Sequence, residues 1–64
     1  MTNLQKYRKA AGFTQSDLSV LSGVNLRTLQ DYEQGRKPIN QAAAVTVHKI
    51  AKALGVTVED LITE

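Results

Sequence analysis

One segment of the chain, residues 14–35, predicts two short helices joined by a very tight turn. This feature constrains the fold more than any other. Thr14 can cap the first helix, and Asp17, three residues later, completes an acidic variant of the capping box. Asn25 can cap the second helix, and Gly35 is a typical left-handed stop at its end. Only residues 22–24 remain for the turn, so the two helices must cross at close range.

The turn has the residue types that such a short connection needs. Gly23 can take a positive φ, and Val24 supplies an apolar side chain that anchors the corner. Ser19 lies where the second helix crosses the first, and its small side chain permits a close approach. The apolar residues expected to face inward from the two helices are Leu18, Leu21, Leu29 and Tyr32.

The rest of the chain indicates three further helices and therefore an all-α fold of five helices. A first helix is expected over residues 3–11, where apolar residues recur at the spacing of one helical face, and Phe13 is expected to enter the core after it. A fourth helix is expected from near Asn40 to a stop at Gly55, and Thr57 can cap a fifth. The inward residues expected from the last two helices are Ala43, Val47, Ile50, Ala51, Leu54, Leu61 and Ile62.

The composition predicts one small domain, residues 1–64, that is soluble and cytoplasmic. There is no Cys, so neither a disulfide nor a thiolate metal site is expected, and no apolar run approaches the roughly 18 residues of a membrane span. Residues 1–56 carry eight basic and three acidic side chains, a net charge of +5, whereas the remaining residues carry −3. A basic body suits a polyanionic partner, although charge alone does not select one.

Two charged residues occupy positions that should face inward. Arg8 lies on the apolar face of the first helix, where an unpaired guanidinium would be costly to desolvate. Glu33 lies on the inward face of the third helix, four residues after Leu29. We therefore predict an ion pair between Arg8 and Glu33 that braces the first helix against the third. The alternative is that both side chains extend to solvent, as long charged side chains often do.

Taken together, these residues resemble the phage-repressor-type (Xre-type, lambda-repressor-like) helix-turn-helix family over nearly the whole chain. The resemblance is carried by Thr14-Gln15, Leu18-Ser19, Gly23-Val24, Leu29, Tyr32-Glu33-Gln34-Gly35 and the stretch from Ala51 to Leu61. It implies a compact five-helix domain that binds double-stranded DNA as a small transcriptional regulator. The second helix would cross the DNA backbone and the third, about residues 25–34, would enter the major groove. The resemblance also implies a buried ion pair at the positions of Arg8 and Glu33.

The resemblance assigns base reading, position by position, to Gln15, Leu26, Arg27, Thr28 and Asp31. Arg27 can form a bidentate pair with guanine, Thr28 can hydrogen-bond or touch a thymine methyl, and Leu26 can read only a methyl. Asp31 could accept from a cytosine amino group or orient Arg27, four residues before it. A plain surface pair between Asp31 and Arg27 is the alternative, and the sequence leaves it open.

Phosphate contacts are expected from Gln15, Asn25, Arg36 and Lys37. Gln15 resembles the glutamine with which the family touches phosphate and sometimes a base. Arg36 and Lys37 follow the reading helix directly and carry the charge that a phosphate needs. Such contacts set affinity and register without reading the sequence.

The sequence gives no support for an enzyme and no reason to expect a cofactor or metal. His48 is the single histidine, and it lies mid-helix without a catalytic partner or a metal-ligand spacing around it. The serious alternative is a protein-interaction module, such as the antitoxin partner of a toxin, because Leu26 and Asp31 make the expected reading face less basic than DNA favours.

Self-association is a further expectation, since relatives usually bind palindromic operators as homodimers on half-sites about 34 Å apart. Ala42 and Val45 are candidate contacts for such a dimer, and Leu61 and Ile62 near the end of the chain are others. Packing of these residues within one monomer is the alternative that we prefer.

Overall fold

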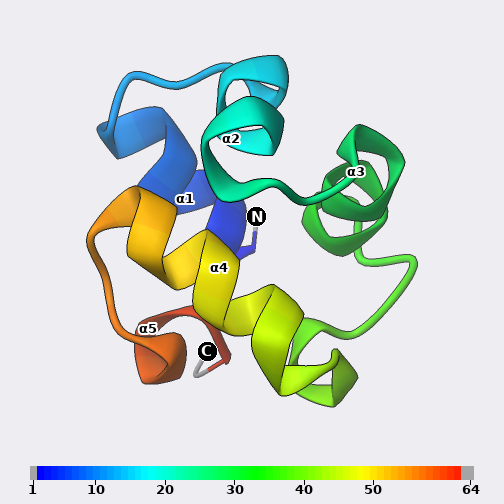
Figure 1. Ribbon diagram of the computed structural model, residues 1–64. Coiled ribbons are helices and arrows are strands. Elements are labelled where there is room, and N and C mark those ends of the chain that lie inside the picture. Colours follow the sequence, from blue (N-terminus) through cyan, green and yellow to red (C-terminus); the bar gives the residue numbers. More distant parts are fainter. Residues whose placement is uncertain (1, 63–64) are drawn as a thin grey trace.

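Helices make up all the regular structure in the part of the chain that the computed structural model describes, residues 2–62 (Figure 1). The elements are α1 (Asn3–Ala10), α2 (Gln15–Ser22), α3 (Leu26–Glu33), a single 3-10 turn η1 (Ile39–Gln41), α4 (Ala44–Leu54) and α5 (Val58–Ile62). The expected all-α fold with five helices is confirmed. None of the described helices is long and apolar enough to cross a membrane.

Local hydrogen bonds set where α2 and α3 begin and end. Thr14 and Asp17 form the expected capping box, in which each side chain accepts from the other residue's backbone N–H at 3.0 Å. Gly23 ends α2 with a φ of +73°, and its N–H donates to the carbonyl oxygen of Ser19. Asn25 caps α3 through its Oδ1, which accepts from the N–H of Arg27 at 2.8 Å. The tight turn therefore forms as the residue types predict.

Two serines add side-chain bonds to this corner. The Ser19 hydroxyl donates to the carbonyl oxygen of Val24 at 2.6 Å, so this residue is more than a small side chain at a crossing point. Ser22 is buried, and its hydroxyl donates to the Leu18 carbonyl oxygen at 2.7 Å while accepting from the Val24 N–H at 3.2 Å. These bonds satisfy polar groups that burial would otherwise leave unpaired.

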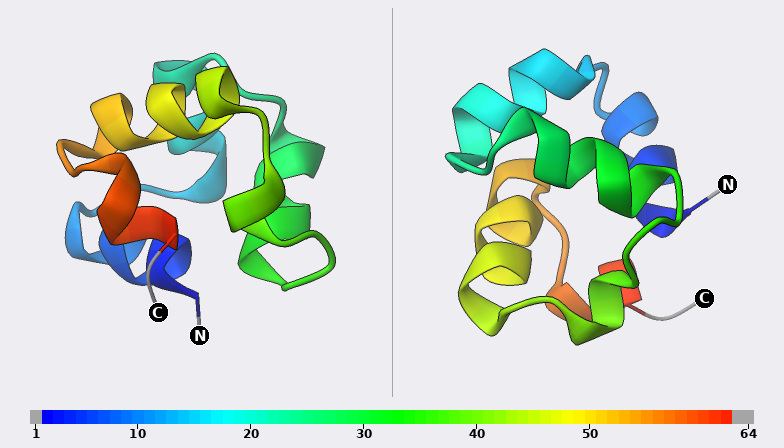
Figure 2. Two further views of the ribbon diagram at one scale, coloured as in Figure 1. Left: turned by 90° about the horizontal axis from the view of Figure 1, so that it is seen from below. Right: turned by 90° about the vertical axis from the view of Figure 1, so that its right-hand side faces the viewer.

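One large side chain from each α-helix is fully buried, and together they form the centre of the core. These residues are Leu4, Leu18, Leu29, Ile50 and Leu61, with Val24, Val47 and Ala51 around them. The helices α2 and α5 both pack against α4 (Figure 1), and α1 packs against both α3 and α5. The Asn3 Nδ2 donates to the carbonyl oxygen of Asp60 at 2.9 Å, so the first and last helices lie side by side (Figure 2).

The predictions that Phe13 and Leu21 enter the core are wrong. Phe13 is half-buried, and Leu21 is 58% exposed beside Val20, which is more exposed still. The two-turn helix α2 covers the core with one narrow face, formed by Leu18 and Ser22 four residues apart. Leu21 lies beside that face, so its spacing of three from Leu18 was not sufficient to bury it.

The start of the fourth helix also differs from the prediction. Residues 39–41 form the separate turn η1, and Ala42 is extended (ψ 158°), so α4 begins at Ala44. Ala43, expected to face inward, is exposed. The break lets Ile39, before it, and Val47, after it, both pack against the core. That requirement is set by the tertiary packing and is not visible in the local sequence.

Candidate nucleic-acid interface

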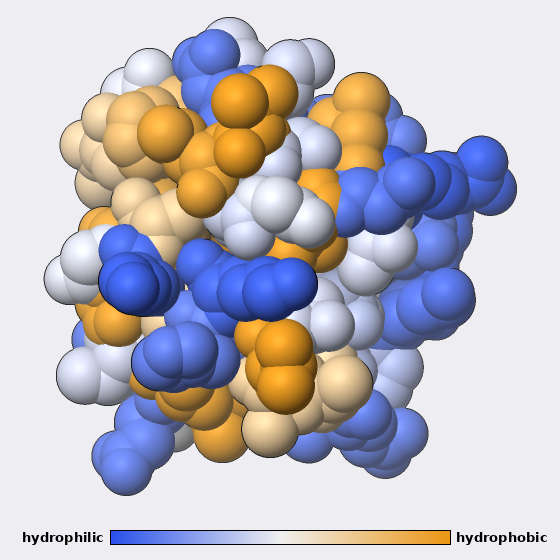
Figure 3. Space-filling view, in the orientation of Figure 1, coloured by the Kyte–Doolittle hydropathy of each residue, from blue (hydrophilic) through white to orange (hydrophobic). Residues whose placement is uncertain are grey.

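Helix α3 lies at the surface and presents one face to solvent. Leu29 anchors it to the core, whereas Leu26 and Arg27 on its first turn are exposed. The right-hand view of Figure 2 shows α3 across the front of the molecule, with α2 above it. In Figure 3 hydrophilic residues line the edge formed by α3 and the loop after it, and further hydrophilic residues lie over α4. This edge is the candidate interface.

The end of α3 is tied to α1 by a bidentate ion pair between Arg8 and Glu33. The Arg8 Nε donates to Glu33 Oε2 at 2.7 Å, and Arg8 Nη2 donates to Glu33 Oε1 at 2.9 Å. Arg8 Nη1 also donates to the carbonyl oxygen of Phe13 at 2.8 Å. Both charged side chains are buried, so the pair has the geometry and the additional hydrogen bond that a buried ion pair needs.

This buried pair also reaches a residue expected at the DNA. The Gln15 side chain, on the first residue of α2, donates through Nε2 to Glu33 Oε1 at 3.3 Å. Gln15 is therefore half-buried and positioned by the last residue of α3. The sequence did not predict this contact, because the contact joins two helices and follows no helical spacing.

The Asp31 cluster, formed by Asp31, Arg27, Arg36 and Lys37, is the second charged group of the interface. One oxygen of the Asp31 carboxylate lies 3.6 Å from Arg27 Nε and 3.7 Å from Arg36 Nη1, and the other lies 3.8 Å from Lys37 Nζ. The backbone oxygen of Asp31 accepts from the N–H groups of Arg36 and Lys37 at 2.9 and 3.4 Å. Asp31 thus holds the backbone of the loop after α3 through its carbonyl oxygen, and its carboxylate attracts the cations of the loop.

Asp31 itself is buried, although it was expected to read a base. Its carboxylate lies 3.6 Å from Nε of Arg27, so the contact that the sequence allowed between these residues is present. The contact fits both a residue that orients Arg27 and a plain pair with it, and the base-reading role of Asp31 stays a prediction. The contacts of Asp31 with Arg36 and Lys37 were missed by sequence reasoning. They lie five and six residues further on, beyond the end of the helix, where periodicity gives no guide.

The chain matches a family model described as helix-turn-helix over residues 4–61. The protein belongs to the helix-turn-helix family. It is 31% identical over 62 residues to the uncharacterized HTH-type transcriptional regulator y4dJ of Sinorhizobium fredii (strain NBRC 101917 / NGR234), and the match covers 97% of this chain and 77% of that protein. The resemblance to the phage-repressor-type (Xre-type) family is confirmed. The search of solved structures finds no significant match.

In this helix-turn-helix, α2 and α3 are the two helices of the motif, and the remaining expected contact residues lie near the start of α3. Asn25 is exposed, and its cap bond uses only the side-chain oxygen, so the amide nitrogen can still donate to another group. Thr28 is half-buried. The structure therefore places Asn25, Leu26 and Arg27 together at one end of α3, and Gln15, Arg36 and Lys37 toward its other end.

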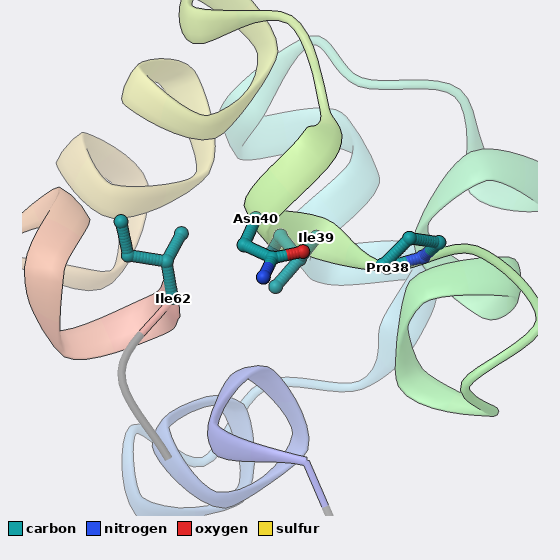
Figure 4. A pocket seen from close by; sticks show the side chains of 4 residues that line it. All are labelled: Pro38, Ile39, Asn40 and Ile62. Carbon is teal, nitrogen blue, oxygen red and sulfur yellow. The ribbon is translucent and has the colours of Figure 1, made fainter.

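A hollow outside this interface lacks the charged groups that a charged ligand would need. This hollow of about 400 Å³ lies between η1 and α5, lined by Pro38, Ile39, Asn40 and Ile62 (Figure 4). None of these four side chains carries a charge. Among the described residues, no group of three or more His, Cys, Asp or Glu side chains could hold a metal ion.

Proposed function

We propose that the protein binds double-stranded DNA sequence-specifically as a small transcriptional regulator, with α3 in the major groove. The observation that carries this proposal is the helix α3, whose first turn is exposed and carries Arg27, whose end is followed by Arg36 and Lys37, and which the Arg8–Glu33 pair fixes. A helix of this diameter fits the major groove of B-DNA, and a fixed helix can offer its side chains to base edges at a defined register. The name of the relative y4dJ, an HTH-type transcriptional regulator, supports the same function.

Base reading falls to the side chains on the outer face of α3. Arg27 extends into solvent and can form a bidentate pair with guanine O6 and N7. Leu26 is suited to a thymine methyl, and Thr28 beside it can hydrogen-bond or touch a methyl. Gln15, whose side chain donates to Glu33, would add a base or phosphate contact from α2.

Phosphate contacts come from the two ends of α3. Arg36 and Lys37 are exposed on the loop after the helix, and their charges suit phosphate oxygens. The free amide nitrogen of Asn25 can donate to a phosphate at the start of the helix. These contacts set the register of α3, and the register decides which bases Arg27 meets.

An NMR titration with duplex DNA tests this function. Addition of a nonspecific duplex at low salt should shift the amide resonances of residues 25–31 and 36–37, because these residues form the proposed contact surface. Selection of bound sites from random duplexes then identifies the preferred sequence. Shifts confined to α4 and α5, or no shifts with either duplex, would contradict DNA binding through α3.

A protein partner is the second candidate function, and the apolar surface of α2 favours it. Val20 and Leu21 are largely exposed and line a surface hollow together with Phe13. A partner that used this surface would leave the amides of residues 25–31 unchanged and shift those of α2 instead. The NMR titration therefore distinguishes the two functions by whether the amides of residues 25–31 or those of α2 shift.

We also propose that two copies bind a palindromic operator, with half-sites about 34 Å apart. Leu61 belongs to the core, and Ala42 and Ile62 are partly buried against it, so these residues already make contacts within one chain. Val45 is the expected contact residue that stays exposed. Sedimentation of the complex with a selected duplex measures the number of copies, and one copy on a site without symmetry would exclude the dimer.

A further inference from the structure

One buried carboxylate lies beneath three exposed cations in the Asp31 cluster. The side chain of Asp31 is 11% exposed, whereas those of Arg27, Arg36 and Lys37 are 75%, 59% and 64% exposed. The cations therefore face the solvent, where DNA would approach, and the carboxylate faces them from the protein side. All the basic residues of α3 and of the loop up to Pro38 belong to this cluster.

The distances show that the carboxylate attracts the cations without fixing them. Each charged contact spans 3.6 to 3.8 Å, which is longer than a hydrogen bond. The three cations are largely exposed, and solvent screens their attraction to the carboxylate, so each contact is weak and exchangeable. The loop backbone is held separately, by the bonds from the Arg36 and Lys37 N–H groups to the Asp31 carbonyl oxygen. Removal of the carboxylate charge should therefore leave the loop in place and change mainly the electrostatic field of its cations.

We infer that Asp31 is a specificity-determining residue that acts through its charge and not through a base contact. Affinity for DNA of any sequence depends on cations that neutralise phosphates. A carboxylate against those cations lowers this affinity for every sequence alike. It also biases the direction of the Arg27 guanidinium. Base reading requires a defined direction of this group, whereas a phosphate contact does not. Asp31 thus raises the ratio of specific to nonspecific binding. The inference rests on the proposed DNA-binding function.

The test is the substitution Asp31→Asn, which removes the charge and keeps the shape of the side chain. Its binding is measured against a duplex selected by the wild-type protein and against a duplex of unrelated sequence, over a range of salt concentrations. We expect the unrelated duplex to bind at least about threefold more tightly, with a salt dependence steeper by about one phosphate contact. The gain for the selected duplex should be smaller, so the specificity ratio falls.

Glu59→Gln is the matched control, because it changes the net charge equally from an exposed position on α5. It should alter neither the specificity ratio nor the salt dependence measurably. Circular dichroism and thermal unfolding verify that both variants are folded, and Asp31→Ser provides a second neutral variant. A similar gain for both neutral variants would exclude an effect of the amide group that Asn introduces.

Three outcomes would overturn the inference. Equal effects of Asp31→Asn and Glu59→Gln would show that only net charge matters. Weaker binding of Asp31→Asn to both duplexes would show that the carboxylate positions the cations for phosphate, or contacts the DNA itself. Failure of the wild-type protein to bind any duplex would remove the proposed function and this inference with it, whereas the first two outcomes leave DNA binding intact.

Discussion

Glu33, the last residue of α3, receives hydrogen bonds from Arg8 on α1 and Gln15 on α2. Its carboxylate is therefore a joint between three helices. The sequence predicted the pair with Arg8 because two charges lay on inward faces. It could not predict the bond from Gln15, since that contact depends on how α2 and α3 cross.

Substitution of Glu33 by Gln should destabilise the fold strongly. The Arg8 guanidinium would remain buried without its counter-charge, and loss of one partner of a buried pair costs about 3–5 kcal/mol. Urea unfolding followed by circular dichroism measures the change. The exposed control Glu59→Gln should stay within about 0.5 kcal/mol of the wild type. A loss below about 1 kcal/mol for Glu33→Gln would mean that the pair contributes little.

Arg27 and Lys37 should give different results when each is replaced by Ala. Arg27→Ala should cost about 1–3 kcal/mol of binding free energy on the selected duplex and relax the preference at one base. Lys37→Ala should weaken binding to all sequences alike and reduce the salt slope by about 1. Binding isotherms on the selected duplex and its single-base variants distinguish these results. Equal losses on every duplex for both variants would contradict the division between reading and phosphate contacts.

At the scale of the helix, local chemistry predicted some boundaries and missed others. The cap of α2 was predictable because Thr14 and Asp17 lie three residues apart, and both bonds form within that turn. The break between η1 and α4 was not, since it arises where Ile39 packs against a core that distant residues build. The prediction that Leu21 enters the core failed for a related reason, because its exposure depends on the width of the face that α2 packs against α4.

The left-handed conformation of Gly23 makes the turn of the motif sensitive to substitution. Gly23→Ala should lower the free energy of unfolding by roughly 1–2 kcal/mol, the cost of a left-handed conformation for a residue with a Cβ. Apart from Gly23 and its two neighbours in the chain, no residue comes within 4 Å of the position such a Cβ would take, so a steric clash should add nothing. Gly23→Asn should lose less, because Asn tolerates this conformation. Equal losses for Ala and Asn in thermal unfolding would argue against a conformational cause.

For the whole molecule, the core could be predicted in outline from helical spacing. Leu4, Leu18, Leu29, Ile50 and Leu61 all lie on the expected inward faces and are fully buried. The contacts of Asp31 with Arg36 and Lys37 could not be predicted, since they join a helix to the loop that follows it. The fold was therefore more predictable than the interface.

The last helix should be essential for the stability of the whole domain, although it spans only Val58–Ile62. Leu61→Ala would leave a cavity in the core, with an expected loss of about 2–5 kcal/mol. The exposed Val45→Ala on α4 is a control that should change stability little. Denaturant unfolding monitored by circular dichroism measures both. A partial transition that removed α5 alone would contradict a shared core.

The presence of one fully buried large side chain on each α-helix also affects how the domain opens locally. No helix can detach without exposing its part of the same core, so small openings that release single helices should be rare. Native-state hydrogen exchange should then give similar opening free energies for the slowest amides of α1, α2, α3 and α4, close to that of global unfolding. A reading helix that exchanged as slowly as the core would meet DNA already ordered, with little folding left to complete on binding.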